Sequence, residues 1–432
     1  MQIGAGDRFV VEGGRSVGGV ITPAGNKNEA LPVLAATLLA PGASRIANLP
    51  RIRDVATQLE ILGELGASAL RDPNTAETVV DASCLTPRDA TSELARTIRG
   101  SFLLAPGLLH RCGRAVLPRP GGDRIGRRRI DTHLTALRML GAEIETRERQ
   151  YHLTLAGRFR GADIFLDEAS VMATENAVMA AAVAEGVTTI ANAACEPHVR
   201  GLCNFLIAMG ARIRGVGTNV LEIEGVPELQ PASHCIGPDH IELGSFVAIA
   251  AMTGGELTVK GIVPDDLRMM RMVFRRLGVE TRLVSGALFV PAKQELTVQD
   301  DLDGAIPKVD DAPWPGFPSD LTSIALVLAT QARGTVLIHE KMFENRLFFV
   351  DRLIAMGARI VLCDPHRALV TGPSRLYGET ITSPDIRAGM ALIAAALCAE
   401  GRSVIMNAHQ VDRGYERIDE RLQRLGASIT RS

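Results

Sequence analysis

The chain has 432 residues, a length that suits two or three domains and a large buried core. Its 47 Lys and Arg residues nearly balance 49 Asp and Glu residues, which argues against a dedicated nucleic-acid-binding or membrane-surface protein. Seven cysteines are scattered without a CxxC pair, so we expect reduced, mostly buried thiols in a cytoplasmic protein. No signal-peptide pattern opens the chain, and no apolar run reaches the ~18 residues that a membrane span needs.

A pattern repeats along the chain. An apolar, helix-like segment ends in Leu-Gly-Ala or a close variant six times, at intervals of 68 to 79 residues. In each copy a glycine turn and a strand-like run lie upstream, and a helix that is apolar nearly all round comes before them. We expect each Leu-Gly-Ala glycine to end a helix. These glycines are Gly66, Gly141, Gly210, Gly278, Gly357 and Gly426.

Six such repeats predict an α/β protein built as two domains of three repeated units each. A helix without a polar face must be buried on all sides, so the helices should lie inside and the strands outside. The first strands precede the first buried helix and should complete the other domain, so the chain crosses between domains twice. The expected boundaries are residues 27–237 for one domain, residues 1–26 plus 238–432 for the other, and two crossover hinges near Gly25 and Pro238.

The most polar stretch, Leu117–His133, reads LPRPGGDRIGRRRIDTH and surrounds Asp123 with arginines. The arginines are Arg119, Arg124, Arg127, Arg128 and Arg129. Gly121 and Gly122 favour an exposed, mobile loop of the domain 27–237. Guanidinium groups suit phosphate and carboxylate, so the loop is interpreted either as an anion-binding lid or as a solvated basic loop.

Other candidate residues lie where buried helices begin. Lys27 and Asn28 precede the first buried helix and could hold an anion, although Asn28 could instead cap that helix. Arg99 stands beside an apolar run, either as a cleft residue or as a snorkelling side chain. Asp320 begins another buried helix, where an acid serves either as an N-cap or as a base. The histidines lack metal-ligand spacing, so no metal site is expected.

Seven segments, in this order and spacing, carry a family resemblance: GNKNEALPVLAA, PGGDRIGRRRIDTH, SVMATENAVMAAAVAEGVTTIANAACEP, FPSDL, FENR, DIRAG and VDRGYERI. They resemble the UDP-N-acetylglucosamine enolpyruvyltransferases (1-carboxyvinyltransferases) over essentially the whole chain. The resemblance implies the enolpyruvyltransferase fold, two inside-out α/β barrel domains. It also implies transfer of the enolpyruvyl group from phosphoenolpyruvate to the 3'-hydroxyl of UDP-N-acetylglucosamine, the first committed step of peptidoglycan precursor synthesis. No cofactor is implied.

The resemblance also assigns roles to residues of this chain. Lys27, Arg128 and Arg413 match the residues that hold phosphoenolpyruvate. The positions that match the lining of the nucleotide-sugar cleft, or that help to close it, are Asn28, Arg99, Glu196, Asp320, Phe343, Arg346 and Arg387. Asp123 stands where most members carry a lid cysteine that fosfomycin-type epoxides alkylate, so the protein is expected to be insensitive to them.

The implied addition-elimination needs a base, an acid and fixed cations. We assign the base to Asp320, and to Asp123 either the acid role or product release. A free aspartic acid titrates near ~3.9, so the acid role requires burial when the lid closes. Lys27 and Arg413 complete the expected catalytic set.

Several departures from the family pattern bear on the acceptor. They are Arg129, Glu168, Met172 and His240, which together remove positive charge and space from the expected diphosphate-uridine site. Two alternatives therefore stand beside the cell-wall enzyme. One is an enolpyruvyltransferase with a different nucleotide or sugar acceptor in specialised metabolism, and the other is a catalytically silent, ligand-binding regulator. The expected partners are phosphoenolpyruvate and a nucleotide sugar, without nucleic acid or membrane, for a monomer or weak homo-oligomer.

Overall fold

The computed structural model describes residues 7–72, 77–86, 89–90, 92–123 and 125–432. Contacts within the chain divide it into two units. Unit 1 comprises Met1–Ala24, Asp123–Arg128 and Pro238–Ser432, and unit 2 comprises Gly25–Gly122 and Arg129–Gly237. The tip of the arginine-rich loop, Asp123–Arg128, thus groups with unit 1, whereas the sequence-based boundaries put the whole loop in the other domain.

Among its described residues, unit 1 contains three sheets, each of four strands, with the orders β21-β22-β1-β23, β15-β16-β14-β2 and β17-β18-β20-β19. Its strands are β1 (Arg8–Glu12), β2 (Gly19–Ile21), β14 (Leu257–Val259), β15 (Arg282–Val284), β16 (Ala287–Val290), β17 (Lys308–Asp310), β18 (Gly334–His339), β19 (Ile360–Asp364), β20 (Arg367–Gly372), β21 (Thr380–Thr382), β22 (Arg402–Met406) and β23 (Ser428–Arg431). Its helices are α8 (His240–Thr253), α9 (Arg268–Arg276), α10 (Ser319–Gln331), α11 (Val350–Ala355), α12 (Ile386–Cys398) and α13 (Ile418–Arg424), with 3-10 turns η3 (Pro264–Leu267), η4 (Leu302–Gly304) and η5 (Ala408–Arg413).

Unit 2 contains the sheets β13-β3-β5-β4, β11-β12-β10-β9 and β6-β8-β7. Its strands are β3 (Ala43–Ala47), β4 (Ser68–Arg71), β5 (Thr78–Asp81), β6 (Arg114–Pro118), β7 (Glu143–Arg147), β8 (Gln150–Thr154), β9 (Asp163–Phe165), β10 (Val187–Ala191), β11 (Arg212–Arg214), β12 (Val220–Glu224) and β13 (Ser233–Cys235). Its helices are α1 (Lys27–Ala36), α2 (Arg53–Glu64), α3 (Glu93–Thr97), α4 (Ala105–Cys112), α5 (Asp131–Met139), α6 (Val171–Ala182) and α7 (Pro197–Ala208), with 3-10 turns η1 (Thr37–Leu39) and η2 (Arg99–Leu104).

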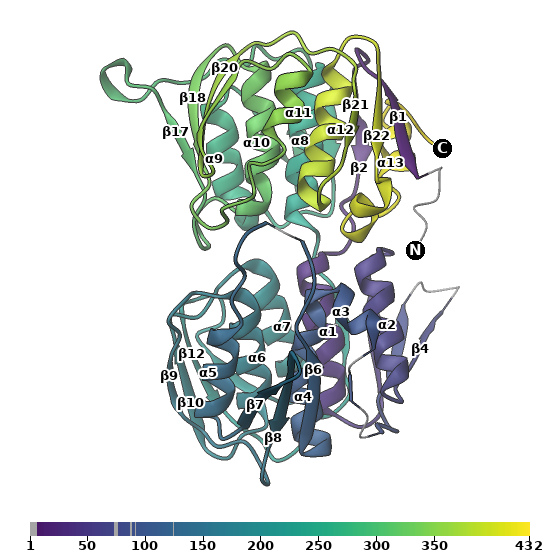
Figure 1. Cartoon of the computed structure of the whole chain (residues 1–432), viewed down its shortest axis with the longest axis vertical. Helices are drawn as coiled ribbons and strands as arrows, with labels where there is room; N and C mark the ends of the chain where they lie inside the picture. The colour runs from purple at the N-terminus through teal and green to yellow at the C-terminus, as the bar shows by residue number, and fades with distance from the viewer. Residues whose placement is uncertain (1–6, 73–76, 87–88, 91, 124) are drawn as a thin grey trace. The chain divides into compact units, whose positions relative to one another are not determined.

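In each unit, apolar helices lie inside and sheets cover them (Figure 1). Helices α8, α10 and α12 pack against one another in unit 1, and every residue of α8 from His240 to Ala251 is buried. The strands alternate instead, as in β1, where Phe9 and Val11 face the core. This arrangement confirms the predicted α/β fold with buried helices.

The start of the chain adds two strands to unit 1 (Figure 1). Strand β1 pairs antiparallel with β22 and β23, and β2 pairs parallel with β14. Each of the six Leu-Gly-Ala glycines has a positive φ, between 88° and 106°. They therefore adopt the left-handed conformation that ends a helix, as the repeat predicts.

The expectation that most cysteines are buried is wrong. Cys203 is buried, Cys112, Cys195 and Cys398 are partly buried, and Cys84, Cys235 and Cys363 are exposed. Cys235 and Cys363 lie in β13 and β19, and strands of the outer layer present one face to solvent. No helix among the described residues is both long and apolar enough to cross a bilayer.

Candidate active site

A carboxylate held by two arginines lies in the first turn of α10, in unit 1. Asp320 accepts hydrogen bonds from Arg346 Nη2 at 2.8 Å and from Arg387 Nε at 3.0 Å. Both arginines are buried, whereas the Asp320 side chain keeps 28% of its surface exposed. A carboxylate that is oriented in this way and open to solvent can accept a proton from a bound hydroxyl group.

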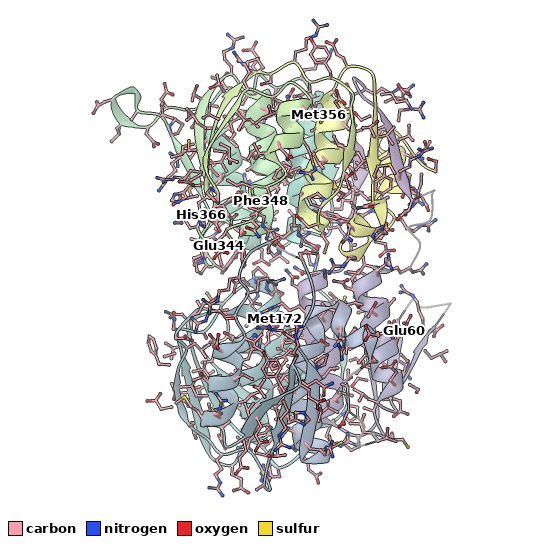
Figure 2. The ribbon with its side chains drawn as sticks, viewed as in Figure 1. Glu60, Met172, Glu344, Phe348, Met356 and His366 are labelled. Atoms are coloured by element: carbon pink, nitrogen blue, oxygen red, sulfur yellow. The ribbon has the colours of Figure 1, made fainter. Side chains whose placement is uncertain are left out.

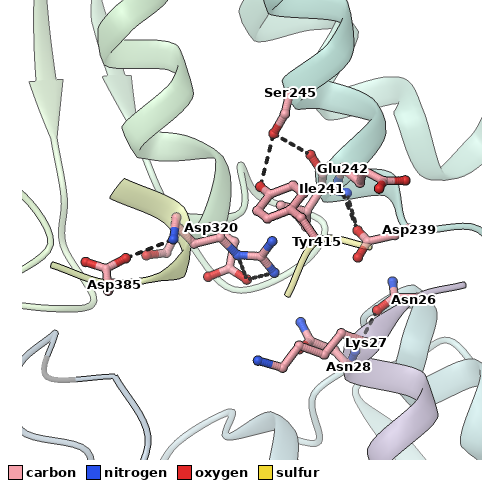
Figure 3. A network of polar contacts seen from close by, with 12 residues as sticks. Asn26, Lys27, Asn28, Asp239, Ile241, Glu242, Ser245, Asp320, Asp385 and Tyr415 are labelled. Carbon is pink, nitrogen blue, oxygen red and sulfur yellow. Dashed lines mark hydrogen bonds and ion pairs between the residues drawn. The ribbon is translucent and has the colours of Figure 1, made fainter. Parts of the chain in front are cut away.

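Arg387 is itself fixed by Asp385 and Tyr415. The Asp385 carboxylate caps α12 and accepts from the backbone N–H of Arg387 at 2.9 Å. The guanidinium lies over the ring of Tyr415, 5.4 Å from its centroid, and the Tyr415 hydroxyl is 3.2 Å from Ser245 Oγ (Figure 3). Burial opposes the positive charge, but Asp320 and Tyr415 raise the pKa of Arg387 above its usual range. Arg387 is therefore a fixed cation.

The ring of Phe343 contacts two arginines, Arg346 and Arg128. The guanidinium carbon of Arg346 lies 5.5 Å from the ring centroid of Phe343, and that of Arg128 lies 6.0 Å from it. Burial lowers the pKa of Arg128, while the neighbouring Asp123 opposes that shift. Phe343 thus orients cations from the FENR segment and from the loop.

Asp123 pairs with Arg413 from η5. The two side chains approach to 2.5 Å between Asp123 Oδ1 and Arg413 Nη1, and they are only 13% and 15% exposed, respectively. Arg413 Nη1 also donates to Gln410 Oε1 at 3.3 Å. Asp123 of the loop and Arg413, which is expected to bind phosphoenolpyruvate, are therefore in contact in unit 1.

The tip of the loop is held by the FENR segment. Glu344 Oε2 accepts from the backbone N–H of Arg127 at 3.0 Å, and the N–H of Asn345 donates to the carbonyl of Ile125 at 3.0 Å. Gly126 has a φ of 132°, and a Cβ atom there would lie 2.1 Å from Glu344 Oε2, so only glycine fits. Figure 2 shows Glu344 on the same side of unit 1 as Phe348 and His366.

The loop is shorter and more buried than the sequence predicts. Strand β6 continues to Pro118 and α5 begins at Asp131. Ile125 and Ile130 are buried because these apolar side chains pack inward, whereas Arg127 and Arg129 are exposed. Arg124 lies outside the described residues, and the mobility of the loop stays a prediction.

In unit 2, Lys27 begins α1. Its Nζ lies 2.6 Å from Asp54 Oδ2, and both side chains are nearly buried. Asn26, not Asn28, caps the helix, because its side chain accepts from the N–H of Asn28 at 2.8 Å (Figure 3). The cap alternative for Asn28 is therefore wrong, and the Asn28 side chain remains half-buried at the helix start.

Two other expected residues also lie in unit 2. Arg99, the first residue of η2, donates from Nη2 to the carbonyl oxygen of Arg129 at 2.7 Å. Glu196 immediately precedes α7. Burial raises the pKa of Glu175 well above its ordinary value, and the charge of Glu196 raises it further. Two carboxyl groups therefore share one poorly solvated region of unit 2.

Four residues depart from the family pattern, and they lie at different places in the fold. Met172 lies in the first turn of α6 (Figure 2), and Glu168 precedes that helix. Arg129 pairs with Asp131 at 2.9 Å. His240 is buried at the start of α8, and burial lowers its pKa, so its imidazole is neutral at pH 7.

The structure places the predicted residues in two groups. Unit 1 holds Asp123, Arg128, Asp320, Phe343, Arg346, Arg387 and Arg413, and unit 2 holds Lys27, Asn28, Arg99 and Glu196. Tyr415 and Ser319 were not predicted as site residues, although both lie within family-like segments, VDRGYERI and FPSDL. Asp54 was not predicted either, because no local pattern marks it. Among the described residues, no group of three or more His, Cys, Asp or Glu is placed to hold a metal ion.

Comparison with protein families gives one model match. The model described as EPSP synthase (3-phosphoshikimate 1-carboxyvinyltransferase) matches residues 11–422. Similar curated proteins include the UDP-N-acetylglucosamine 1-carboxyvinyltransferase of Bradyrhizobium diazoefficiens, 53% identical over 425 residues and 98% of both chains. The protein of the same name from Treponema denticola is 52% identical over 422 residues, again 98% of both chains.

Comparison with solved structures agrees on the fold. The enolpyruvyl transferase NikO from Streptomyces tendae aligns with a TM-score of 0.86 and 26% identity over 99% of both chains. EPSP synthase from Acinetobacter baumannii aligns with a TM-score of 0.74 over 99% of this chain and 100% of that one. Its identity is 18%, so this second likeness bears on the fold alone.

Proposed function

We propose the reaction of this chain on the basis of its family, because the chain belongs to the EPSP synthase (3-phosphoshikimate 1-carboxyvinyltransferase) family. It transfers the enolpyruvyl group of phosphoenolpyruvate to the 3'-hydroxyl of UDP-N-acetylglucosamine and releases phosphate, the first committed step of peptidoglycan precursor synthesis. The observation that carries the choice of acceptor is the 53% identity, over nearly the full length, to a protein named for that acceptor. The relatives give no support to a different acceptor or to a silent regulator.

The roles of the residues are part of this proposal. Asp320 takes the proton of the acceptor hydroxyl, because Arg346 and Arg387 fix its carboxylate. Lys27, Arg128 and Arg413 hold phosphoenolpyruvate and the departing phosphate. The residues that contact the nucleotide sugar or shape its site are Asn28, Arg99, Glu196, Phe343, Arg346 and Arg387.

Asp123 either protonates the methylene carbon of phosphoenolpyruvate or assists product release. Its pairing with Arg413 and its low exposure support a position at the anion site. A carboxylate paired with a guanidinium is a weak nucleophile, so we also propose that the protein is insensitive to fosfomycin-type epoxides.

The two crossovers serve as hinges in this proposal. In unit 2, the N–H of Asn26 donates to the carbonyl of Gly237 at 2.8 Å, and Glu29 accepts from the N–H of Gly237 at 3.1 Å. In unit 1, the N–H of Ala24 donates to Glu242 Oε2 at 2.7 Å. A buried carboxylate in each unit thus anchors one crossover, which supports domains of residues 27–237 and of 1–26 plus 238–432.

We place the reaction in the cytoplasm, because seven scattered cysteines without a CxxC pair suit a reducing compartment, and expect a monomer or weak homo-oligomer without nucleic-acid or membrane partners. The test is acceptor-dependent phosphate release. Purified protein should release phosphate from phosphoenolpyruvate when UDP-N-acetylglucosamine is added, and not when the acceptor is omitted. Equal release with and without the acceptor would contradict the proposal.

A further inference from the structure

A second carboxyl group, behind Asp320, joins the start of α10 to the FENR segment. Glu340 follows β18 and has no exposed surface. Its Oε1 accepts from Ser319 Oγ at 2.8 Å and from the backbone N–H of Phe343 at 3.2 Å. Ser319 Oγ in turn accepts from Arg346 Nε at 3.3 Å. Glu340 therefore fixes Phe343 directly, and it fixes Arg346, a partner of Asp320, through one hydroxyl.

The Glu340 carboxyl group interacts with another buried carboxyl group, that of Asp311. Asp311 follows β17, has no exposed surface, and accepts from the backbone N–H of Lys341 at 2.5 Å through Oδ1. Within the described part of the chain, Glu340 Oε2 and Asp311 Oδ2 are fully buried and accept from no donor. Two buried carboxylates repel each other, whereas one proton between them satisfies both oxygens.

We propose that Glu340 and Asp311 share one proton in the folded protein, and that this pair positions Phe343, Arg346 and hence the base Asp320. This inference rests on the proposed function for its catalytic consequence only. Glu340 and Asp311 are positioning residues, because they reach the site through Ser319 and the backbone. When the shared proton passes to solvent, two negative charges remain in a buried space, and the FENR segment should loosen.

Burial, together with the neighbouring charges, sets the pH at which the pair loses its proton. Burial raises the pKa of Glu340 to about 8, and Asp311 contributes to the rise, while Arg346 opposes it. The Lys341 ammonium is engaged by Asp310 at 2.8 Å, and His366 Nδ1 lies 2.7 Å from the Glu340 carbonyl oxygen. The pair should therefore hold its proton at neutral pH and lose it above about pH 8.

The single tryptophan of the chain reports on this region. Trp314 lies three residues after Asp311, in the turn closed by a bridge between Asp311 and Phe317. Its fluorescence in the substrate-free protein, titrated from about pH 6 to about pH 10, should show a transition near pH 8. His240 also contacts Trp314, but burial lowers the pKa of His240, so its transition lies below neutral pH.

Two variants and one control decide the origin of the transition. Glu340→Gln carries a permanent donor toward Asp311 and keeps an acceptor for Ser319, so the transition should disappear. Asp311→Asn removes the neighbouring charge, so the transition should move to lower pH by about one unit or more. Glu379→Gln, at an exposed glutamate of the same unit, should behave as wild type. Should Glu340→Gln fail to fold, Asp311→Asn still tests the shared proton.

Turnover gives the second measurement. In phosphate release, the wild-type kcat should fall about fivefold or more between pH 7 and pH 9.5, whereas Glu340→Gln should stay within about threefold over that range. A wild-type fluorescence transition near pH 8 that persists unchanged in both variants would overturn the proposal, as would its absence from the wild type. Because the fluorescence titration needs no substrate, failure of the proposed reaction would leave this test intact.

Discussion

Asp320 and Arg387 are 67 residues apart in the chain, yet Arg387 Nη2 lies 2.8 Å from Asp320 Oδ2. They belong to α10 and α12, two buried helices that pack against each other and come from successive repeats. The orientation of the proposed base therefore depends on the packing of two apolar helices, because neither helix could fix the carboxylate alone.

Replacing Asp320 with Asn should abolish most turnover and spare substrate binding. The amide keeps one of the two oxygens, as an acceptor for either Arg346 or Arg387, but it cannot take the proton of the acceptor hydroxyl. We expect kcat to fall ~10²-fold or more and the substrate dissociation constants to change by only about a few fold. Steady-state kinetics and calorimetric binding measure both. Asp351→Asn, at an exposed carboxylate of unit 1, is the control. Near-normal turnover in Asp320→Asn would remove Asp320 as the base.

Asp123→Cys should create sensitivity to a fosfomycin-type epoxide. Arg413, 2.5 Å from Asp123, would favour a thiolate at this position, and a thiolate is a far stronger nucleophile than a paired carboxylate. Intact-protein mass spectrometry followed by peptide mapping should find an adduct on the variant lid and none on the wild-type lid. Asp123→Ser serves as the control without a thiol. An adduct on wild-type Asp123, or none on a turnover-competent Asp123→Cys protein, would show that Asp123 is misplaced relative to the anion site.

Two glycines with equally open surroundings should respond oppositely to alanine. A Cβ atom at Gly210 or at Gly63 would have no neighbour within 4 Å, but Gly210 has a φ of 106° whereas Gly63 lies inside α2. Gly210→Ala should cost ~1–2 kcal/mol of unfolding free energy because the left-handed conformation is strained. Gly63→Ala should gain ~0.5–1 kcal/mol. Urea unfolding measures both, and a stable Gly210→Ala protein would contradict the helix-end role of the repeat glycines.

The stability of unit 1 should depend on the protonation of Glu242. Burial raises its pKa from 4.5 to about 7, although Arg421 opposes this shift. The unfolded chain releases this proton first as pH rises, so the unfolding free energy should fall between about pH 4.5 and about pH 7 by roughly 3 kcal/mol from this residue. Glu242→Gln should reduce the fall and Glu256→Gln, at an exposed glutamate, should not. Identical pH dependence in wild type and Glu242→Gln would refute the assignment.

The sixfold repeat in the sequence made the fold predictable. The glycine spacing and the apolar helices indicate buried helices and outer strands, since both follow from local sequence. The exposure of Cys235 and Cys363 was missed because it depends on which face of a strand meets solvent. Glu344 and Asp54 were missed because their partners, Arg127 and Lys27, lie far from them in sequence. Motifs identify the groups that we propose to touch substrate, whereas the residues that hold those groups emerge only from packing.

The roles proposed for the site residues depend on the identity of the acceptor, which a competition assay can establish. Purified protein is given limiting phosphoenolpyruvate with equal concentrations of UDP-N-acetylglucosamine and 3-phosphoshikimate, and the products are identified by mass spectrometry. We expect the product to be enolpyruvyl-UDP-N-acetylglucosamine, in an amount equal to that of the released phosphate, and we expect no enolpyruvyl-3-phosphoshikimate. Enolpyruvyl transfer to 3-phosphoshikimate, or consumption of phosphoenolpyruvate without a UDP-sugar product, would contradict it.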